Sequence, residues 1–371
     1  MRIKKFGILS KFLARHFWAS FALVFSTISG VIVLFSILNN SQSFASRVSG
    51  RVPMRIFLEF AAVDVFYALG TTIPLSVLLA GIITFWKLSR SSELTVIRGV
   101  GLSVWNFLAP IIMVCTFLGI LNMAILNPIG AVLQRRIQRI SYKYDISRAN
   151  PLLFSQSGLW LKERSEFTQS FMHAEYIRKE GDVLNARNLT IFVTDLRSNF
   201  LRRIEADSAV LKNKSLELYD VRMIDPRLFE ESFASYVYPT SLTVDRIEEN
   251  SSAPETFSFW ELPGFISFFE ASGFSARRHR SHFYMLLFMP LMLCAMLLVA
   301  TVFSIAPSRG RTNLLLKLSG GVLCGFAVFF VDQVVRAIGT SGRMPLLLSS
   351  ISVPLIAVML SSTLLLHKED G

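Results

Sequence analysis

Four ionisable residues lie in or at the ends of long apolar stretches, where a charge is costly and is a functional candidate for that reason. They are Asp64, Lys317, Asp332 and Arg336. Asp332 and Arg336 are four residues apart, the spacing at which an acid and a base form an ion pair on one face of a helix. Two interpretations stay open for this pair: a structural ion pair that lowers the cost of burial, and a direct functional role.

A second candidate is the polar segment 87–101, which separates two apolar stretches. We expect Ser91 to cap a short helix, with Glu93 in its first turn, where the helix dipole favours a negative charge. The other residues on this amphipathic helix are Leu94, Ile97 and Arg98. A helix of this kind fits a groove of a partner protein. A plain surface loop is the alternative.

Catalysis by this chain is not indicated. The sequence has no Walker A motif, no G-x-S-x-G elbow and no H-E-x-x-H pair. Its five His residues are too scattered to form a metal site with the three Cys residues. We therefore predict no catalytic residue, no metal site and no cofactor bound by this chain.

The elements that position these residues are hydrocarbon-length helices. Hydrophobic residues make up 52% of the chain and the mean hydropathy is +0.49, values above those of soluble domains. A helix needs about 20 apolar residues to cross a bilayer. Six stretches qualify: Phe17–Leu38, Val63–Trp86, Val104–Leu126, Phe283–Ile305, Leu314–Val335 and Pro345–Leu366. Their internal prolines are tolerated inside a membrane bundle.

The distribution of Lys and Arg predicts the orientation of these spans. Twelve basic residues lie in the termini and in the segments after spans two and four, against five in the opposite short segments. Both termini are then cytoplasmic, and residues 127–282 lie outside. Apolar residues at helical spacing among lysines also predict an interfacial helix before the first span, with a plain basic tail as the alternative.

The net charge of +12 does not indicate nucleic-acid binding. Residues 127–282 hold 21 basic and 20 acidic residues, so the excess lies almost entirely in the membrane-associated parts. There it follows from topology and from attraction to anionic lipid headgroups.

Short strands with polar turns dominate the outer region and predict an all-β domain, either a sandwich, a barrel or a jelly roll. They are Gly158–Lys162, Ser170–Ile177, Leu189–Leu196, Phe200–Ile204, Ser208–Leu211, Ser215–Val221 and Ser235–Val244. Phe192 alternates with the aliphatic row Leu189, Ile191 and Val193, so both faces are partly apolar. Either an acyl-chain groove or sheet-on-sheet packing accounts for this. The predicted domains are 1–126, 127–282 and 283–371.

Four short motifs occur in order along this layout. They are Ser92-Glu-Leu-Thr-Val-Ile-Arg-Gly-Val-Gly101, Gly158-Leu-Trp160, Phe330-Val-Asp-Gln333 and Arg343-Met-Pro345. With the order of three spans, a domain and three spans, the chain resembles the lipopolysaccharide-export permease family, LptF/LptG, over its whole length. Gly158-Leu-Trp160 and the closing Leu364-Leu-Leu-His-Lys-Glu-Asp-Gly371 favour the LptG branch.

The resemblance implies a bacterial inner-membrane ABC-type exporter of lipopolysaccharide, with six transmembrane helices and an extracytoplasmic all-β, jelly-roll-like domain. It implies an LptF-like permease as partner, an LptB-like ATPase dimer that binds the ATP, and an LptC-like periplasmic bridge. It assigns ATPase coupling to Ser92, Glu93, Leu94, Ile97 and Arg98. It places a lateral gate on spans one and five, with Val33, Asp332 and Arg336 as candidates. Phe192 and Leu216 are the candidates for acyl-chain contact in the outer domain.

One departure from the family bears on lipid binding. Members carry Lys near the outer end of span one, whereas this region holds Val33, Asn39 and Asn40. Nearby cations bind phosphate in their place or only anchor the loop. These residues are Arg47, Arg51 and Arg55.

The favoured hypothesis is a transport subunit without catalytic residues. The alternative is a structural or signalling membrane protein whose periplasmic domain binds another protein. An intramembrane enzyme comes third, because the spans offer few groups for acid–base chemistry.

Overall fold

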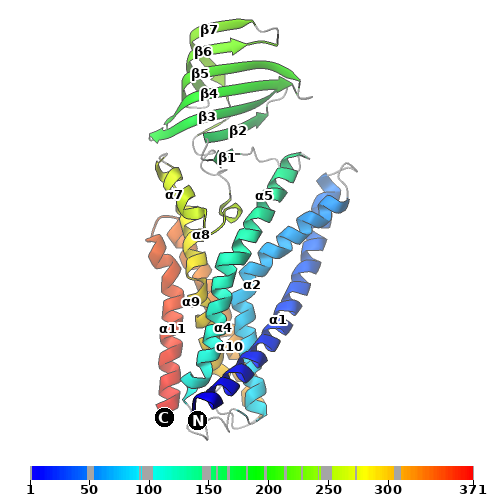
Figure 1. Ribbon diagram of the computed structural model, residues 1–371, viewed down its shortest axis with the longest axis vertical. Helices are drawn as coiled ribbons and strands as arrows, with labels where there is room; N and C mark the ends of the chain where they lie inside the picture. Colours follow the sequence, from blue (N-terminus) through cyan, green and yellow to red (C-terminus); the bar gives the residue numbers. More distant parts are fainter. Residues whose placement is uncertain are drawn as a thin grey trace. The chain divides into compact units, whose positions relative to one another are not determined.

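The chain folds into two units, one helical and one built on a β-sheet (Figure 1). The helical unit comprises Met1–Ile137, Ser258–Trp260 and Arg280–Gly371, and the β unit comprises Gln138–Phe257 and Glu261–His279. The computed structural model describes residues 2–47, 54–91, 93, 103–143, 152–155, 158–164, 168–180, 183–195, 199–212, 215–226, 229–240, 242–243, 253–271, 274–304 and 311–370.

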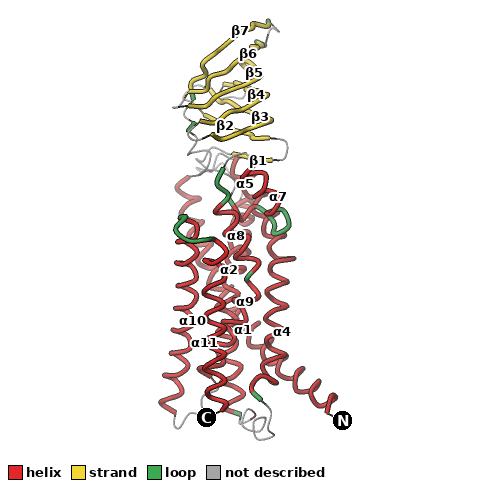
Figure 2. Tube along the Cα trace, turned by 90° about the vertical axis from the view of Figure 1, so that its left-hand side faces the viewer, coloured by secondary structure: helices red, strands yellow, loops and turns green. Residues whose placement is uncertain are grey.

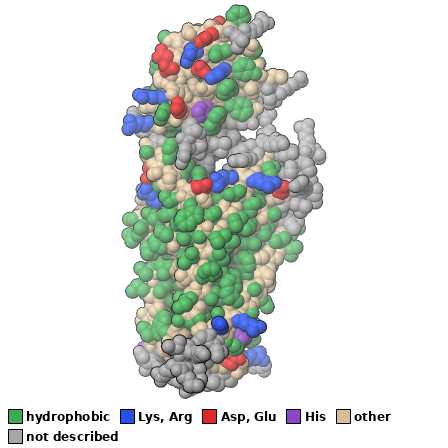
Figure 3. Space-filling model, viewed as in Figure 1, with side chains coloured by type: hydrophobic (Ala, Val, Ile, Leu, Met, Phe, Trp, Pro, Cys, Tyr) green, Lys and Arg blue, Asp and Glu red, His purple; other side chains and the backbone are tan. Residues whose placement is uncertain are grey.

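Within the described residues, five helices are long and apolar enough to cross a membrane, and a sixth span results if one bent helix pair is counted as a unit. The helices of the helical unit are α1 (Arg2–Arg47), α2 (Met54–Arg90), α4 (Val104–Leu121), the π-helical turn η1 (Asn122–Leu126), α5 (Asn127–Lys143), α8 (Arg277–Leu287), α9 (Met289–Ser304), α10 (Arg311–Thr340) and α11 (Leu346–Asp370). The end of α5, from Gln138, and the start of α8, up to His279, are assigned to the β unit. On the face seen in Figure 3, hydrophobic side chains are spread over the middle of this unit, whereas the Lys, Arg, Asp and Glu side chains lie near its two ends, as a lipid-facing surface requires.

The predicted fourth span, Phe283–Ile305, is the bent pair. Its two helices, α8 and α9, meet at an angle of 53°. Pro290 lies in the first turn of α9, where its missing N–H and its ring interrupt a continuous helix. Sequence hydropathy detects the apolar length of such a segment but not this break.

Helix α9 is the centre of the bundle and packs against α2, α4, α10 and α11. Small residues bring the helix backbones close, as is usual inside membranes. Gly81 of α2 faces Ala300, and Gly321 of α10 faces Phe303. A Cβ atom on Gly119 of α4 would lie 2.5 Å from Cα of Pro290, so that contact admits only glycine without a shift.

Helix α1 packs against α2 and α4 and leaves its opposite side exposed. Leu13, Phe17 and Phe21 form its buried stripe, at helical spacing. The predicted interfacial helix is the first part of this single long helix, and in Figure 2 the N-terminal end turns away from the other helices.

The β unit is a seven-stranded antiparallel sheet whose strands follow one another in sequence order (Figure 1). They are β1 (Leu152–Ser155), β2 (Gly158–Arg164), β3 (Thr168–Glu180), β4 (Val183–Asp195), β5 (Phe200–Lys212), β6 (Ser215–Ile224) and β7 (Glu230–Pro239). The coarser prediction of an all-β antiparallel unit is confirmed. The described strands form an up-and-down meander, without the crossovers of a jelly roll. The two strands predicted within 200–211 are one strand, β5. The short helices η2 (Pro254–Thr256) and α7 (Leu262–Ala271) follow the sheet.

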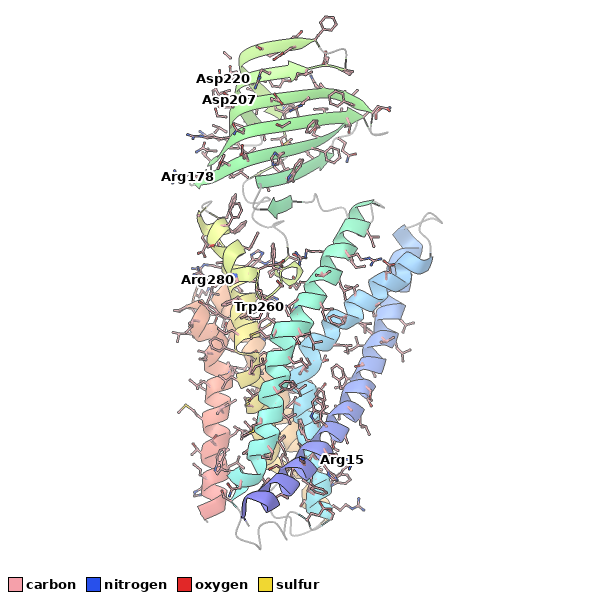
Figure 4. The ribbon with its side chains drawn as sticks, in the orientation of Figure 1. Arg15, Arg178, Asp207, Asp220, Trp260 and Arg280 are labelled. Carbon is pink, nitrogen blue, oxygen red and sulfur yellow. The ribbon has the colours of Figure 1, made fainter. Side chains whose placement is uncertain are left out.

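Three long strands bend at the same level, and the bend changes which residues face inward. Along β4 the buried residues change from Ala186 to Leu189, and Asn188 between them has a positive φ of 52°. The same change occurs at Asp207 and Asp220, which lie on neighbouring strands (Figure 4). Asp220 has a φ of 51°. Asn and Asp tolerate this left-handed conformation better than most residues.

The bent sheet closes over its own apolar face. Tyr238 of β7 shares a hydrogen bond of 2.6 Å with Ser170 of β3. The Thr240 hydroxyl donates to a carboxylate oxygen of Glu163 in β2 at 2.7 Å. These bonds join the last strand to the second and third across the sheet. The side chains inside are fully buried and form the core; they include Leu159, Met172, Ile191, Ile204 and Leu218.

Candidate functional site

The predicted coupling segment follows the end of α2. The Ser91 N–H donates to the Lys87 carbonyl at 3.0 Å and its hydroxyl donates to the Leu88 carbonyl at 3.3 Å. Ser91 therefore closes the preceding helix. The Arg90 guanidinium lies 5.6 Å from the centre of the Trp86 ring, in cation–π range.

Glu93 is the coupling candidate that the structure describes. It is helical and half-buried, and its Oε2 atom is buried without a hydrogen-bond partner among the described residues. A carboxylate oxygen in that condition is costly to the isolated chain. The other four candidates, Ser92, Leu94, Ile97 and Arg98, lie outside the described residues.

The two charged gate candidates form an ion pair inside α10. Arg336 donates to Asp332 at 2.6 Å, and their side chains are only 14% and 4% exposed. Asp332 lies one heptad from Gly325 and Gly339, which closely face Leu78 of α2 and Ser349 of α11. The pair is therefore on the packed side of α10.

The opposite side of α10 is apolar and exposed along its length. Leu316, Leu323 and Phe330 recur on it every seven residues. On α1, Val33 is half-buried between the exposed Val31 and Leu34. These two surfaces are what α1 and α10 offer to lipid or to another subunit.

The cations predicted to meet phosphate are at the edge of the described structure. Arg47 ends α1 and Arg55 is in the first turn of α2, both without described side chains, and Arg51 lies outside the described residues. One further cation, which sequence reasoning missed, has a described side chain. Arg136 of α5 is exposed and pairs with Glu59 of α2 at 3.3 Å. Its signal was the run of arginines at the end of the third span.

Phe192 and Leu216, the two acyl-chain candidates, lie on opposite faces of the sheet. Leu216 is in the buried interior, opposite Leu211 and Tyr238. Phe192 is on the outer face, with the Arg203 guanidinium 5.4 Å above its ring. Alternation puts Phe192 opposite its aliphatic neighbours, as the structure does. Between distant positions alternation does not hold, because each strand bend shifts the alternation by one residue.

Both faces carry further side chains of interest. On the outer face Trp160 is exposed and lies against His173, with ring centres 4.2 Å apart. At the closed end of the interior, burial raises the pKa of Tyr238, so its hydroxyl stays protonated in the bond to Ser170. Burial of a hydroxyl is favourable only with such a partner.

Comparison with known proteins decides the family. The sequence model of the family described as lipopolysaccharide export system permease LptF/LptG matches residues 11–367. The chain belongs to the LptF/LptG family. A curated relative from Haemophilus influenzae strain Rd, the lipopolysaccharide export system permease protein LptG, is 20% identical over 353 residues, which cover 94% of this chain and 96% of the relative. The resemblance seen in the sequence is confirmed, including its LptG-like character.

Membership in the LptF/LptG family makes the chain a transporter component of the permease class. Together with its apolar helices, this fits a multi-pass protein of the inner membrane. Within the described residues no group of three or more His, Cys, Asp or Glu side chains is placed to hold a metal ion. That the chain binds no cofactor stays a prediction.

Proposed function

We propose that this LptF/LptG family member is a permease subunit that extracts lipopolysaccharide from the inner membrane with energy from ATP hydrolysed by a separate LptB-like ATPase dimer. It pairs with an LptF-like permease and delivers the lipid to an LptC-like periplasmic bridge. The observation that carries the proposal is the family match over residues 11–367, which spans both helical halves and the β unit. Counting α8–α9 as one span gives six spans, with both termini cytoplasmic and residues 127–282 periplasmic.

Glu93 is proposed as the main contact to the ATPase. Support comes from its position directly after α2, on the side that carries the excess of Lys and Arg, and from its buried oxygen without a described donor. A hydrogen-bond donor of the partner satisfies that oxygen on binding. Removal of the unfavourable free energy of the unpaired carboxylate oxygen then favours the complex. Ser92, Leu94, Ile97 and Arg98 complete the proposed contact.

The lipid is proposed to enter between α1 and α10 of paired permeases. The exposed apolar sides of these two helices support this, because acyl chains match them chemically. Cations at the outer ends of the spans hold the phosphates, with Arg136 added to Arg47, Arg51 and Arg55. Val33 lines the gate directly, whereas Asp332 and Arg336 support it from the packed side of α10.

The test reverses the charge of Glu93. In the purified complex of this chain with its partner subunits, reconstituted in vesicles with lipopolysaccharide, Glu93→Arg is expected to abolish lipid release and to weaken binding of the ATPase. A matched control is Asp225→Arg, the same change in the exposed turn after β6. Wild-type release and wild-type stimulation of ATP hydrolysis by Glu93→Arg would reject the proposal.

A structural or signalling protein is the second candidate, in which the β unit binds a protein partner. The packed interior favours it, because Ile191, Ile204 and Leu218 fill that space without a ligand. Photocrosslinkers at Leu216 and Phe192 in the full chain separate the two. Crosslinks from Leu216 to lipopolysaccharide support the permease proposal, whereas crosslinks from Phe192 to protein alone support the second candidate.

A further inference from the structure

Three consecutive residues of the chain that returns from the β-sheet belong to the helical unit. Ser258–Trp260 are part of that unit, whereas the residues directly before and after them, up to Phe257 and from Glu261 onward, are part of the β unit. We call Ser258–Trp260 the tie segment.

The tie segment is held to the third span by two hydrogen bonds. The Phe259 backbone N–H donates to Oδ1 of Asn127 at 2.7 Å. The Trp260 indole N–H donates to the Ala124 carbonyl at 3.5 Å. Figure 4 shows Trp260 among the helices of the helical unit. Phe259 is only 8% exposed and is the buried residue of the tie segment, whereas Trp260 is 65% exposed and lies at the surface.

The tie segment also contacts the fourth span. The Phe259 ring stacks on Phe283 of α8, with ring centres 5.0 Å apart and an angle of 13° between the planes. Stacking of the buried Phe259 ring on the half-buried Phe283 ring adds to the stabilisation from burial itself. Phe259 therefore contacts both spans three and four at their outer ends.

The backbone of the third span is unusual at this point. Ala124 lies in the π turn Asn122–Leu126, and Asn127 is the first residue after it. Single π turns within helices are uncommon and often mark functional positions. Asn122 in the same turn is buried near Gly70 of α2.

Spans three and four are tightly joined next to this turn. Gly119 lies three residues before it and packs against Pro290, beside the 53° bend between α8 and α9. Because the contact is between backbones, the two spans cannot slide past each other there without separating. The tie segment is thus attached to a stiff part of the bundle.

We propose that the tie segment is a positioning element that transmits movement of spans three and four to the β unit during transport. A connecting segment that makes no contacts with the spans does not pass their movement on to the β unit, because its backbone dihedrals change instead. A chain held by a backbone hydrogen bond and a buried aromatic ring moves with the spans instead. The inference rests on the proposed permease function and deepens it.

The first test separates the effect of the hydrogen bond between the Phe259 N–H and Asn127 from the effect of the size of the Asn127 side chain. Asn127→Leu removes the acceptor at similar volume, whereas Asn127→Asp keeps an oxygen for the Phe259 N–H. Loss of one hydrogen bond should raise the population of molecules in which the tie segment is detached from the third span about fivefold. In the reconstituted complex with partner subunits, Asn127→Leu is expected to lower lipid release per ATP hydrolysed several-fold, and Asn127→Asp to restore most of it. Equal ratios in Asn127→Leu and the unaltered complex would overturn the proposal.

A second variant covers the case in which Asn127→Leu does not fold. Two glycines inserted between Phe257 and Ser258, together with two between Trp260 and Glu261, leave every contact of the tie segment in place but add slack on both sides towards the β unit. The proposal expects ATP hydrolysis to continue while lipid release per ATP falls. A purely local structural role leaves that ratio unchanged, and such a result would overturn it.

A crosslink decides whether transport needs the tie segment to stay attached to the third span or to detach from it. Cys115, Cys294 and Cys324 are first replaced by Ala, and Ala124→Cys and Trp260→Cys are added to Asn127→Leu. Bridging the two cysteines with a short bifunctional maleimide is expected to restore lipid release per ATP. If bridging abolishes the remaining release, the tie is a latch that must open, and the proposal is wrong. Trp260→Cys alone, treated with the same reagent, is the control.

Failure of the inference and failure of the proposed function give different results. If the unaltered complex releases no lipopolysaccharide with ATP, the proposed function fails. If it releases lipid and all tie variants match it, only the inference fails.

Discussion

The fourth and fifth spans are neighbours of similar apolar character that the fold uses differently. Helix α9 is buried on nearly every side by α2, α4, α10 and α11. Helix α10 has one packed side, marked by glycines, and one exposed apolar side. The contrast shows that hydropathy selects membrane spans but does not rank them from the centre of a bundle to its edge.

The physical reason is the solvent. Lipid tails are as apolar as leucine, so an apolar side chain gains little by leaving them for the bundle interior. What distinguishes the packed side of α10 is close approach, at Gly321, Gly325 and Gly339, and the ion pair of Asp332 with Arg336. The following predictions test this contrast, beginning with the largest effect.

The ion pair on the packed side of α10 gives the strongest test. Removing one partner leaves the other charge buried alone, so Asp332→Leu should destabilise the fold by about 3–5 kcal/mol. The double change Asp332→Leu with Arg336→Leu should recover most of that loss. Unfolding in mixed micelles, followed by circular dichroism, measures both. A double variant as unstable as the single one would contradict the packed position of this pair.

Two leucines compare α9 and α10 directly. Leu297 of α9 is fully buried, whereas Leu323 of α10 is 70% exposed. Leu297→Ala should lower the free energy of unfolding by about 2 kcal/mol. The loss comes mainly from packing, because a leucine side chain is as stable in lipid as in the bundle interior. Leu323→Ala should change stability by much less. The midpoint of unfolding of the two variants decides, and equal losses would remove the distinction between the helices.

Two glycines give the smallest effect, with opposite signs. Gly119→Ala puts a Cβ against the Pro290 backbone, whereas a Cβ on Gly30 of α1 meets nothing within 4 Å. Overpacking costs about 1–3 kcal/mol, and Ala gains about 1 kcal/mol over Gly in a helix. Gly119→Ala should therefore lower the thermal midpoint slightly, whereas Gly30→Ala should raise it slightly. Two variants of equal midpoint would show that the α4–α9 contact adapts freely.

Much of the fold was predictable because its signals are local. Hydrocarbon-length apolar stretches predict the spans, and alternation within Leu189–Val193 predicts β4 and puts Phe192 on the face opposite the aliphatic residues. Phe200–Ile204 and Ser208–Leu211 were predicted as separate strands, although the hydrogen-bonded strand β5 continues through the bend at Asp207.

Part of the candidate site was beyond such reasoning because it depends on residues far apart in the chain. The Asn127 side chain accepts a hydrogen bond from the Phe259 N–H, and Arg136 forms an ion pair with Glu59. Neither residue has a local pattern that names its partner. The bend before Pro290 is similar, because proline permits a kink but the neighbouring helices decide its angle.

The sequence by itself determined that this chain is a membrane protein with a β-rich region between two helical parts, because length and periodicity of apolar residues are local properties. It also carried the motifs of the LptF/LptG family, which the family match confirms. Only the tertiary structure decided that α9 lies at the centre, that Asp332 and Arg336 face inward, and that Leu216 and Phe192 are on opposite faces. Those outcomes depend on which surfaces come within van der Waals distance, and in an apolar solvent that is settled by shape and by hydrogen bonds rather than by hydropathy.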